Sequence, residues 1–224
     1  MSMEGKKVLV IGNARSGIGA AKLAHAHKAD VYIYDGKPYE KWDDKAKAQI
    51  EALKAEGIHY ILGEDVNVKD YDLFITSPGI SLEIDLIKAA YAEGKKVTGE
   101  FEFASTFCKA PIVAITGTNG KTTTTTLVGE IMKAYNPQTF VVGNIGRAFS
   151  EEVEHIPAEG IVVAEVSSFQ LETAETFHPK VSSVLNITPD HLNRHHTMEN
   201  YCQCKYNIFK NQTADEYCIL NTRD

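Results

Sequence analysis

The chain has 224 residues and a formal net charge of −7, with 43% hydrophobic and 24% charged residues. These values are typical of a globular protein large enough for one large or two small domains. The acidic balance argues against a nucleic-acid partner and against binding to an anionic membrane, because both need a basic face. The polar start and the short first apolar run, residues 8–11, argue against a signal or spanning segment, so we expect a cytoplasmic protein.

The first hundred residues alternate apolar runs with helical patterns. Strands are predicted at residues 8–11, 31–34, 71–76 and 96–98, and helices after Gly12–Gly17 and at 44–56 and 85–93. This order predicts a Rossmann-like α/β domain over residues 1–99. Asp35 falls 23 positions after Gly12 and could meet a ribose or a base. Ala14 stands where a dinucleotide fingerprint has its second glycine, which argues against a dinucleotide.

A second α/β unit is expected over residues 100–224. A β-branched strand at 112–115 runs into the sequence T-G-T-N-G-K-T, and apolar residues recur at helical spacing from Leu127 to Met132. A strand, a glycine loop and a helix form a phosphate-binding loop, in which backbone N–H groups, Lys121 and a metal on the Thr122 hydroxyl hold the phosphates. Ile115 stands where the general pattern has glycine, so an ordinary strand-to-helix connection is the alternative.

Further strands are predicted at residues 139–142, 161–165, 181–186 and 217–221, the last as a buried strand. Glu165 closes its apolar strand as a carboxylate aimed at a metal would, and the alternative is a strand-end charge in solvent. His191 follows another strand end. His195 and His196 are interpreted as surface imidazoles rather than as a metal cluster.

Lys205 lies in a predicted helix at residues 200–209, whose Tyr201 and Ile208 face inward. A lone lysine in such a helix is usually solvated. The four cysteines show no C-x-x-C spacing and are interpreted as reduced and incidental: Cys108, Cys202, Cys204 and Cys218.

Together these motifs resemble the Mur ligases of peptidoglycan synthesis, a step of cell-wall biogenesis. The loop at residues 117–123 is similar to the ATP loop that Mur ligases share with folylpolyglutamate synthases. The string E-V-S-S-F-Q-L-E at 165–172 resembles the D-glutamate-adding members of the family. The segments S-P-G-I at 77–80, G-N-I-G at 143–146 and T-P-D-H-L at 188–192 also fit.

The resemblance implies an ATP-dependent amide ligase that joins D-glutamate to UDP-N-acetylmuramoyl-L-alanine through an acyl phosphate, with ATP and Mg²⁺ as cofactors. The implied ATP loop is Gly117, Thr118, Asn119, Gly120, Lys121, Thr122 and Thr123. The implied catalytic residues are Lys121, Asn144, Glu165, His191 and Lys205. The implied Mg²⁺ ligands are Thr122, Glu165, His191 and Lys205, the last as a carbamate. The implied substrate contacts are Ala14, Arg15, Ser16, Asp35, Ser77, Pro78, Gly79, Asn144 and Ser167.

The main departure from the family is length. Mur ligases carry a third, C-terminal domain, which we expect to be absent here, with the central domain incomplete. We therefore expect a truncated form without full ligase turnover. Two alternatives stay open: a sister ligase for another amino acid, against which residues 167–172 argue, and a nucleotide or nucleotide-sugar binding module with a vestigial ATP loop.

Overall fold

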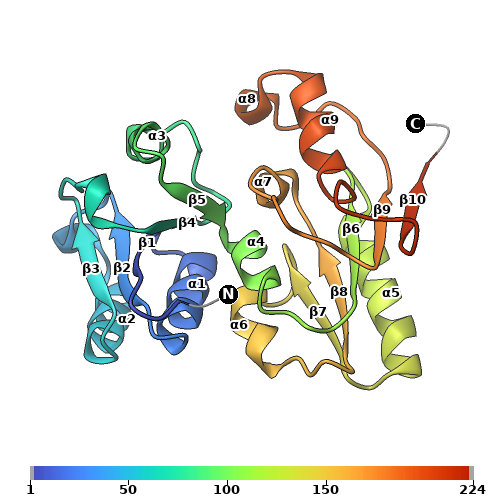
Figure 1. The fold of residues 1–224 in the computed structure, drawn as a ribbon, viewed down its shortest axis with the longest axis horizontal. Coiled ribbons are helices and arrows are strands. Elements are labelled where there is room, and N and C mark those ends of the chain that lie inside the picture. The colour runs from blue at the N-terminus through green and yellow to red at the C-terminus, as the bar shows by residue number, and fades with distance from the viewer. Residues whose placement is uncertain (1–2, 222–224) are drawn as a thin grey trace. The chain divides into compact units, whose positions relative to one another are not determined.

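The computed structural model describes residues 3–221, which divide into two compact units between Phe103 and Ala104 (Figure 1). Each unit contains a five-stranded sheet in which every pair of neighbouring strands is parallel. The predicted α/β fold, with a Rossmann-like first part and a P-loop-type second part, is confirmed. The division between the units falls inside helix α4 (Glu100–Ser105). No helix within residues 3–221 has the length and apolar character needed to cross a membrane.

The first unit has the strand order β3-β2-β1-β4-β5. Its strands are β1 (Lys7–Ile11), β2 (Asp30–Asp35), β3 (His59–Leu62), β4 (Leu73–Thr76) and β5 (Lys96–Gly99). Its helices are α1 (Arg15–Ala26), α2 (Asp44–Ala55), α3 (Asp85–Ala92) and the short 3₁₀ helices η1 (Tyr39–Lys41) and η2 (Val68–Asp70). The sequence did not predict β3, an edge strand whose four residues are all partly or fully exposed.

Strand β1 is the centre of this sheet because it pairs with β2 on one side and β4 on the other. Val8, Leu9 and Val10 are fully buried, as expected for a strand covered on both faces by crossover helices. The carboxyl ends of β1, β2 and β4 therefore meet at one edge of the sheet. In an open α/β sheet, ligands bind at this edge, where the strand order reverses.

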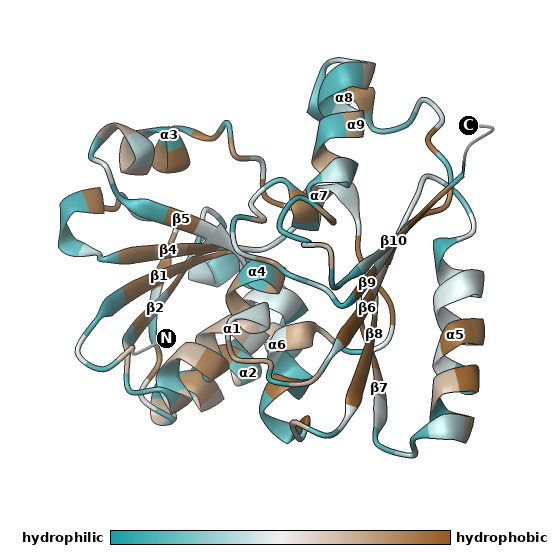
Figure 2. Cartoon of the chain, turned by 45° about the vertical axis from the view of Figure 1, so that its right-hand side comes forward, coloured by the Kyte–Doolittle hydropathy of each residue, from teal (hydrophilic) through white to brown (hydrophobic). Residues whose placement is uncertain are grey.

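The second unit has the strand order β10-β9-β6-β8-β7. Its strands are β6 (Ile112–Thr116), β7 (Thr139–Gly143), β8 (Ile161–Glu165), β9 (Val181–Val184) and β10 (Tyr217–Leu220). Its helices are α5 (Lys121–Tyr135), α6 (Phe149–Glu152), α7 (Ser168–Leu171), α8 (Leu192–His195), α9 (Met198–Tyr206) and the 3₁₀ helix η3 (Val153–His155). In Figure 2 the neighbouring strands β6 and β8 are predominantly brown, which marks the apolar centre of this sheet.

Two features of this unit differ from the burial that the sequence predicts. Strand β10 forms where expected, but all four of its residues are exposed, because it pairs with β9 at the edge of the sheet. Helix α5 also forms as predicted, and Val128 and Met132 pack against the core. Leu127 and Ile131, however, are 60% and 57% exposed. Apolar periodicity located both elements and overestimated how much of each is covered.

Candidate functional site

The predicted phosphate loop connects β6 to α5 in the second unit. Helix α5 begins at Lys121, directly after Gly120, which has a φ of 80° and occupies the N-cap position. A left-handed residue is favourable here only as glycine, because a side chain would be strained. The first N–H groups of a 15-residue helix are thus presented beside the loop, the arrangement that binds anions at helix N-termini.

Two lysine side chains converge on one carbonyl oxygen of this loop. Lys121 Nζ donates to the Gly117 carbonyl at 2.8 Å and to Thr118 O at 2.8 Å, and Lys205 Nζ, from α9, donates to the same Gly117 oxygen at 2.8 Å. Lys205 is only 1% exposed, so the alternative of a solvated lone lysine is ruled out. Burial lowers the pKa of the Lys205 amine to about 8, and the charge of Lys121 adds to this effect.

The loop is tied to the segment after β9 by a set of reciprocal hydrogen bonds. Asn119 N–H donates to Asn186 Oδ1 at 2.9 Å, and Asn186 Nδ2 returns a bond to the Asn119 carbonyl at 3.0 Å. Thr118 Oγ1 donates to Thr188 O, accepts from Thr188 N–H, and lies 3.0 Å from the Tyr201 hydroxyl. These contacts link the loop to the segment after β9 and to α9. Sequence reasoning missed the roles of Asn186 and Tyr201, because neither belongs to the loop motif.

Glu165 and Asn144 lie together at the carboxyl ends of β8 and β7. Gly143 is in register with Glu165, and Asn144 Nδ2 donates to Glu165 Oε1 at 2.7 Å. Glu165 is 1% exposed, so a strand-end charge in solvent is ruled out. Its second oxygen, Oε2, is buried without a hydrogen-bond partner among the described residues. A buried carboxylate oxygen without a partner is costly unless a cation or a donor binds it, so the site fits a metal such as Mg²⁺.

The remaining predicted residues of this unit are more exposed. Thr122 and Thr123 are exposed in the first turn of α5. His191 is exposed with a φ of 51°, and its Nε2 lies 3.5 Å from Asp190 Oδ2. Ser167 is the N-cap of α7 and bonds to Gln170, so its hydroxyl already has a structural role.

His195 contradicts its prediction as a surface imidazole. It is 4% exposed, and its Nδ1 lies 3.4 Å from Glu172 Oε1. Burial, reinforced by the nearby charge of Arg194, lowers the pKa of the His195 imidazole to about 4. The sequence could not reveal this contact, because Glu172 and His195 lie on different helical segments. His196, in contrast, is exposed as predicted.

In the first unit, a cavity of about 400 Å³ opens at the carboxyl ends of β1 and β2. Of the predicted substrate residues, Asp35 and Gly79 line it, together with Gly12, whereas Ala14 and Arg15 are exposed at the start of α1. Its lining residues are Ile11, Gly12, Tyr34, Asp35, Gly36, Gly79, Ile80, Ser81, Ile84, Asp85 and Leu86. The apolar side chains after the Ser77–Gly79 turn were not predicted to line a site.

The other predicted residues of the first unit lie around this cavity rather than among its lining residues. Ser77 is buried, and its Oγ donates to the Gly12 carbonyl at 3.4 Å. Ser16 and Pro78 are partly exposed. Asp35 holds the adjacent turn, because its two oxygens accept from the N–H groups of Asn13 at 3.2 Å and Lys37 at 3.0 Å.

Several solved structures share this fold. The chain matches the UDP-N-acetylmuramate:L-alanyl-gamma-D-glutamyl-meso-diaminopimelate ligase from Neisseria meningitides with a TM-score of 0.58, 16% identity and coverage of 98% of this chain and 72% of that one. It matches UDP-N-acetylmuramate-alanine ligase MurC from Thermotoga maritima with a TM-score of 0.54, 22% identity and coverage of 98% and 50%. At these identities the likeness establishes the fold, which is that of the Mur ligases.

Sequence relatives give the family. The Mur ligase middle domain matches residues 115–224. The chain is 47% identical over 224 residues to a protein of Lachnoclostridium phytofermentans and 49% identical over 222 residues to one of Pelotomaculum thermopropionicum, both named UDP-N-acetylmuramoylalanine–D-glutamate ligase. These matches cover 100% and 98% of this chain, and 49% and 48% of the relatives. The chain belongs to the Mur ligase family and spans about half the length of these relatives.

Proposed function

We propose that this chain carries the nucleotide-binding and sugar-nucleotide-binding parts of an ATP-dependent amide ligase that adds D-glutamate to UDP-N-acetylmuramoyl-L-alanine. The observation that carries the proposal is the convergence of Lys121 and Lys205 on the Gly117 carbonyl. Two ammonium groups held this close repel each other unless an anion lies beside them or one is neutral. A phosphate at the start of α5 supplies the anion, and the names of the two relatives supply the substrates.

Lys121, the loop and the first N–H groups of α5 would bind the phosphates of ATP. The predicted loop residues are Gly117, Thr118, Asn119, Gly120, Lys121, Thr122 and Thr123. Mg²⁺ would be held by Thr122 and Glu165, whose free Oε2 supports the assignment, and by His191 and Lys205. When bound, Mg²⁺ would neutralise the negative charge that shifts between the phosphate groups during phosphoryl transfer.

Lys205 would serve as a metal ligand only after reaction with CO₂. The amine attacks CO₂ as the neutral form, loses a proton, and becomes a carbamate with a negative charge. The lowered pKa of about 8 makes the neutral amine accessible near neutral pH, whereas an exposed lysine would be almost fully charged. Burial therefore favours this modification of Lys205 over modification of the solvated lysines.

In the proposed reaction, a carboxylate oxygen of the sugar nucleotide attacks the γ-phosphorus of ATP, and ADP leaves. The amine of D-glutamate then attacks the acyl carbon, phosphate leaves, and one amine proton is lost. Asn144 would orient the substrate near the γ-phosphate, because its amide is fixed by Glu165 at 2.7 Å. Lys121 would stabilise the charge that develops on the phosphoryl oxygens.

The cavity of the first unit would bind the UDP part of the substrate. Asp35 offers a carboxylate for the ribose or uracil, and the apolar wall that includes Ile80 and Ile84 suits a base. Ser77, Pro78 and Gly79 would contact the uracil or diphosphate, as would Ala14, Arg15 and Ser16. Ser167, in the second unit, stays a predicted substrate contact.

Calorimetric titration of the 224-residue chain tests this proposal. UDP-N-acetylmuramoyl-L-alanine should bind with one site, and NAD should not bind. Asp35→Ala should weaken binding about tenfold, in line with loss of a charge-assisted hydrogen bond. Asp44→Ala, which changes an exposed residue at the start of α2, is the matched control and should leave binding unchanged. Tight NAD binding would instead support a dinucleotide-binding module.

A further inference from the structure

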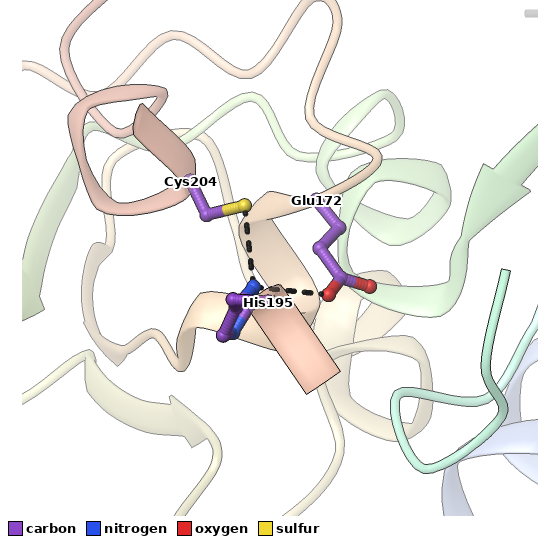
Figure 3. Close-up of side chains that lie close together, drawn as sticks. All are labelled: Glu172, His195 and Cys204. Atoms are coloured by element: carbon purple, nitrogen blue, oxygen red, sulfur yellow. Dashed lines mark hydrogen bonds and ion pairs between the residues drawn. The ribbon is translucent and has the colours of Figure 1, made fainter. Parts of the chain in front are cut away.

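Three potential metal ligands from three segments of the second unit lie close together. Figure 3 shows the imidazole of His195, the last residue of α8, between the thiol of Cys204 on α9 and the carboxylate of Glu172, which follows α7. The side chains of His195 and Glu172 are 2% and 10% exposed, and Cys204 is partly buried. None of the three belongs to the proposed nucleotide site.

The distances between the ligand atoms suit a tetrahedral ion. His195 Nδ1 lies 3.6 Å from Cys204 Sγ and 3.4 Å from Glu172 Oε1, and all three ligand atoms lie within 4.8 Å of one another. Zinc bonds of about 2.3 Å to sulfur and about 2.0–2.2 Å to nitrogen and oxygen give tetrahedral edges of about 3.6 Å and about 3.4 Å for these two pairs. Two of the three distances between ligand atoms therefore already match those of a tetrahedral zinc site.

The residues around the cluster orient its ligands. Arg194 donates to both oxygens of Glu172, from Nε to Oε1 at 3.1 Å and from Nη2 to Oε2 at 2.6 Å. Ser168 Oγ lies 3.0 Å from His195 Nε2. With the proton on Nε2, the imidazole donates to Ser168 and turns the Nδ1 lone pair toward Cys204 and Glu172. Such outer partners fix the ring and the carboxylate in established metal sites.

We propose that Glu172, His195 and Cys204 form a binding site for Zn²⁺, with a fourth position open to water. A thiolate and an imidazole select zinc over Mg²⁺, which takes oxygen ligands. The thiolate and the carboxylate together balance the charge of the ion. On binding, the thiol proton leaves to solvent and the imidazole stays neutral with its proton on Nε2. The ion would fasten α7, α8 and α9 to one another.

Titration of Co²⁺ into the reduced 224-residue chain tests the site, because cobalt in a tetrahedral thiolate site gives a sulfur-to-metal charge-transfer band. We expect one equivalent of Co²⁺ to produce the band and Zn²⁺ to abolish it by displacement. Cys204→Ser should remove the band, whereas Cys202→Ser, a matched change on the same helix outside the cluster, should keep it. Ser168→Ala should weaken binding about 10–100-fold through loss of the outer partner.

A second measurement needs no variant. Zn²⁺ should slow alkylation of Cys204 by iodoacetamide in the wild-type chain at least tenfold, while alkylation of the exposed Cys218 is unchanged. Peptide mass spectrometry reports each cysteine separately. A band that survives Cys204→Ser or disappears in Cys202→Ser would overturn the proposal. Equal alkylation of Cys204 with and without Zn²⁺ would overturn it as well.

Discussion

Replacing Lys205 by methionine should stabilise the chain at neutral pH. The native amine is 1% exposed and has a pKa of about 8, lowered from 10.5 by burial and by Lys121. A lysine whose pKa is lower in the folded state reduces the free energy of unfolding. This loss is complete below the folded-state pKa and disappears above the unfolded-state pKa. The unfolded chain binds more protons between these values, so the free energy of unfolding rises with pH in that window.

The size of the effect follows from the two pKa values. At about 1.36 kcal/mol per pKa unit, holding a charged Lys205 in the fold costs roughly 3 kcal/mol at pH 7. Its hydrogen bond to the Gly117 carbonyl contributes about 1.5–3 kcal/mol in return. Methionine occupies the space of the lysine stem, and Lys121 still donates to the Gly117 oxygen. We expect Lys205→Met to raise the free energy of unfolding by about 1 kcal/mol at pH 7.

Urea denaturation in carbonate-free buffer measures this difference at pH 7 and pH 9.5. The wild-type chain should gain about 2 kcal/mol relative to Lys205→Met between these two pH values, as the native amine loses its proton. Lys133→Met, an exposed change on α5, is the control and should show no such pH dependence. If Lys205→Met is less stable than the wild-type chain by the same amount at pH 7 and at pH 9.5, the reasoning is refuted.

Three further predictions concern the loop and the strand ends. Gly143→Ala should lower the free energy of unfolding by about 2–4 kcal/mol in urea denaturation, since the φ of Gly143 is 103° and the new Cβ would lie 2.3 Å from Glu165 O. Gly79→Ala is the control: it has open space around it, so its free energy of unfolding should stay within about 0.5 kcal/mol of the wild-type value. Tyr201→Phe removes the hydroxyl partner of Thr118 and should cost about 1 kcal/mol in the same assay, and no loss would mean that the bond is not stabilising. Glu165→Gln should weaken the binding of Mg²⁺·ATP, measured by calorimetry, at least about tenfold, because a carboxylate ligand is lost. Stability should not fall, because the amide oxygen of the glutamine can still accept from Asn144. Unchanged binding would exclude Glu165 as a metal ligand.

The order of strands and helices was largely readable from the sequence, because buried parallel strands are short apolar runs between helical patterns. The central strands β1 and β6 both fall where these runs predicted them. The runs carry less information at sheet edges. β3 has no strong apolar run and was missed, and β10 has one but lies exposed. Edge strands are covered on fewer sides, so burial and composition are only loosely linked there.

The chemical state of the site residues was harder to predict than their positions. Lys205 and Lys121 are 84 positions apart in the chain, yet both donate to the Gly117 oxygen. Only the packing of α9 against the loop makes Lys205 buried and lowers its pKa. His195 is a parallel case, because Glu172 and Cys204 come to it from other segments. Spacing within one segment cannot report contacts of this kind.

The most direct test of the account is calorimetric binding of a non-hydrolysable ATP analogue with Mg²⁺ to the 224-residue chain. We predict one site, with affinity about 10–100-fold lower in Lys121→Met, because a charged hydrogen bond to phosphate is worth roughly 1.5–3 kcal/mol. Lys133→Met, on the same helix but in its last turn, should bind as the wild type does. Binding that is equal in Lys121→Met and in the wild-type chain would contradict the assignment of residues 117–123 as a phosphate loop.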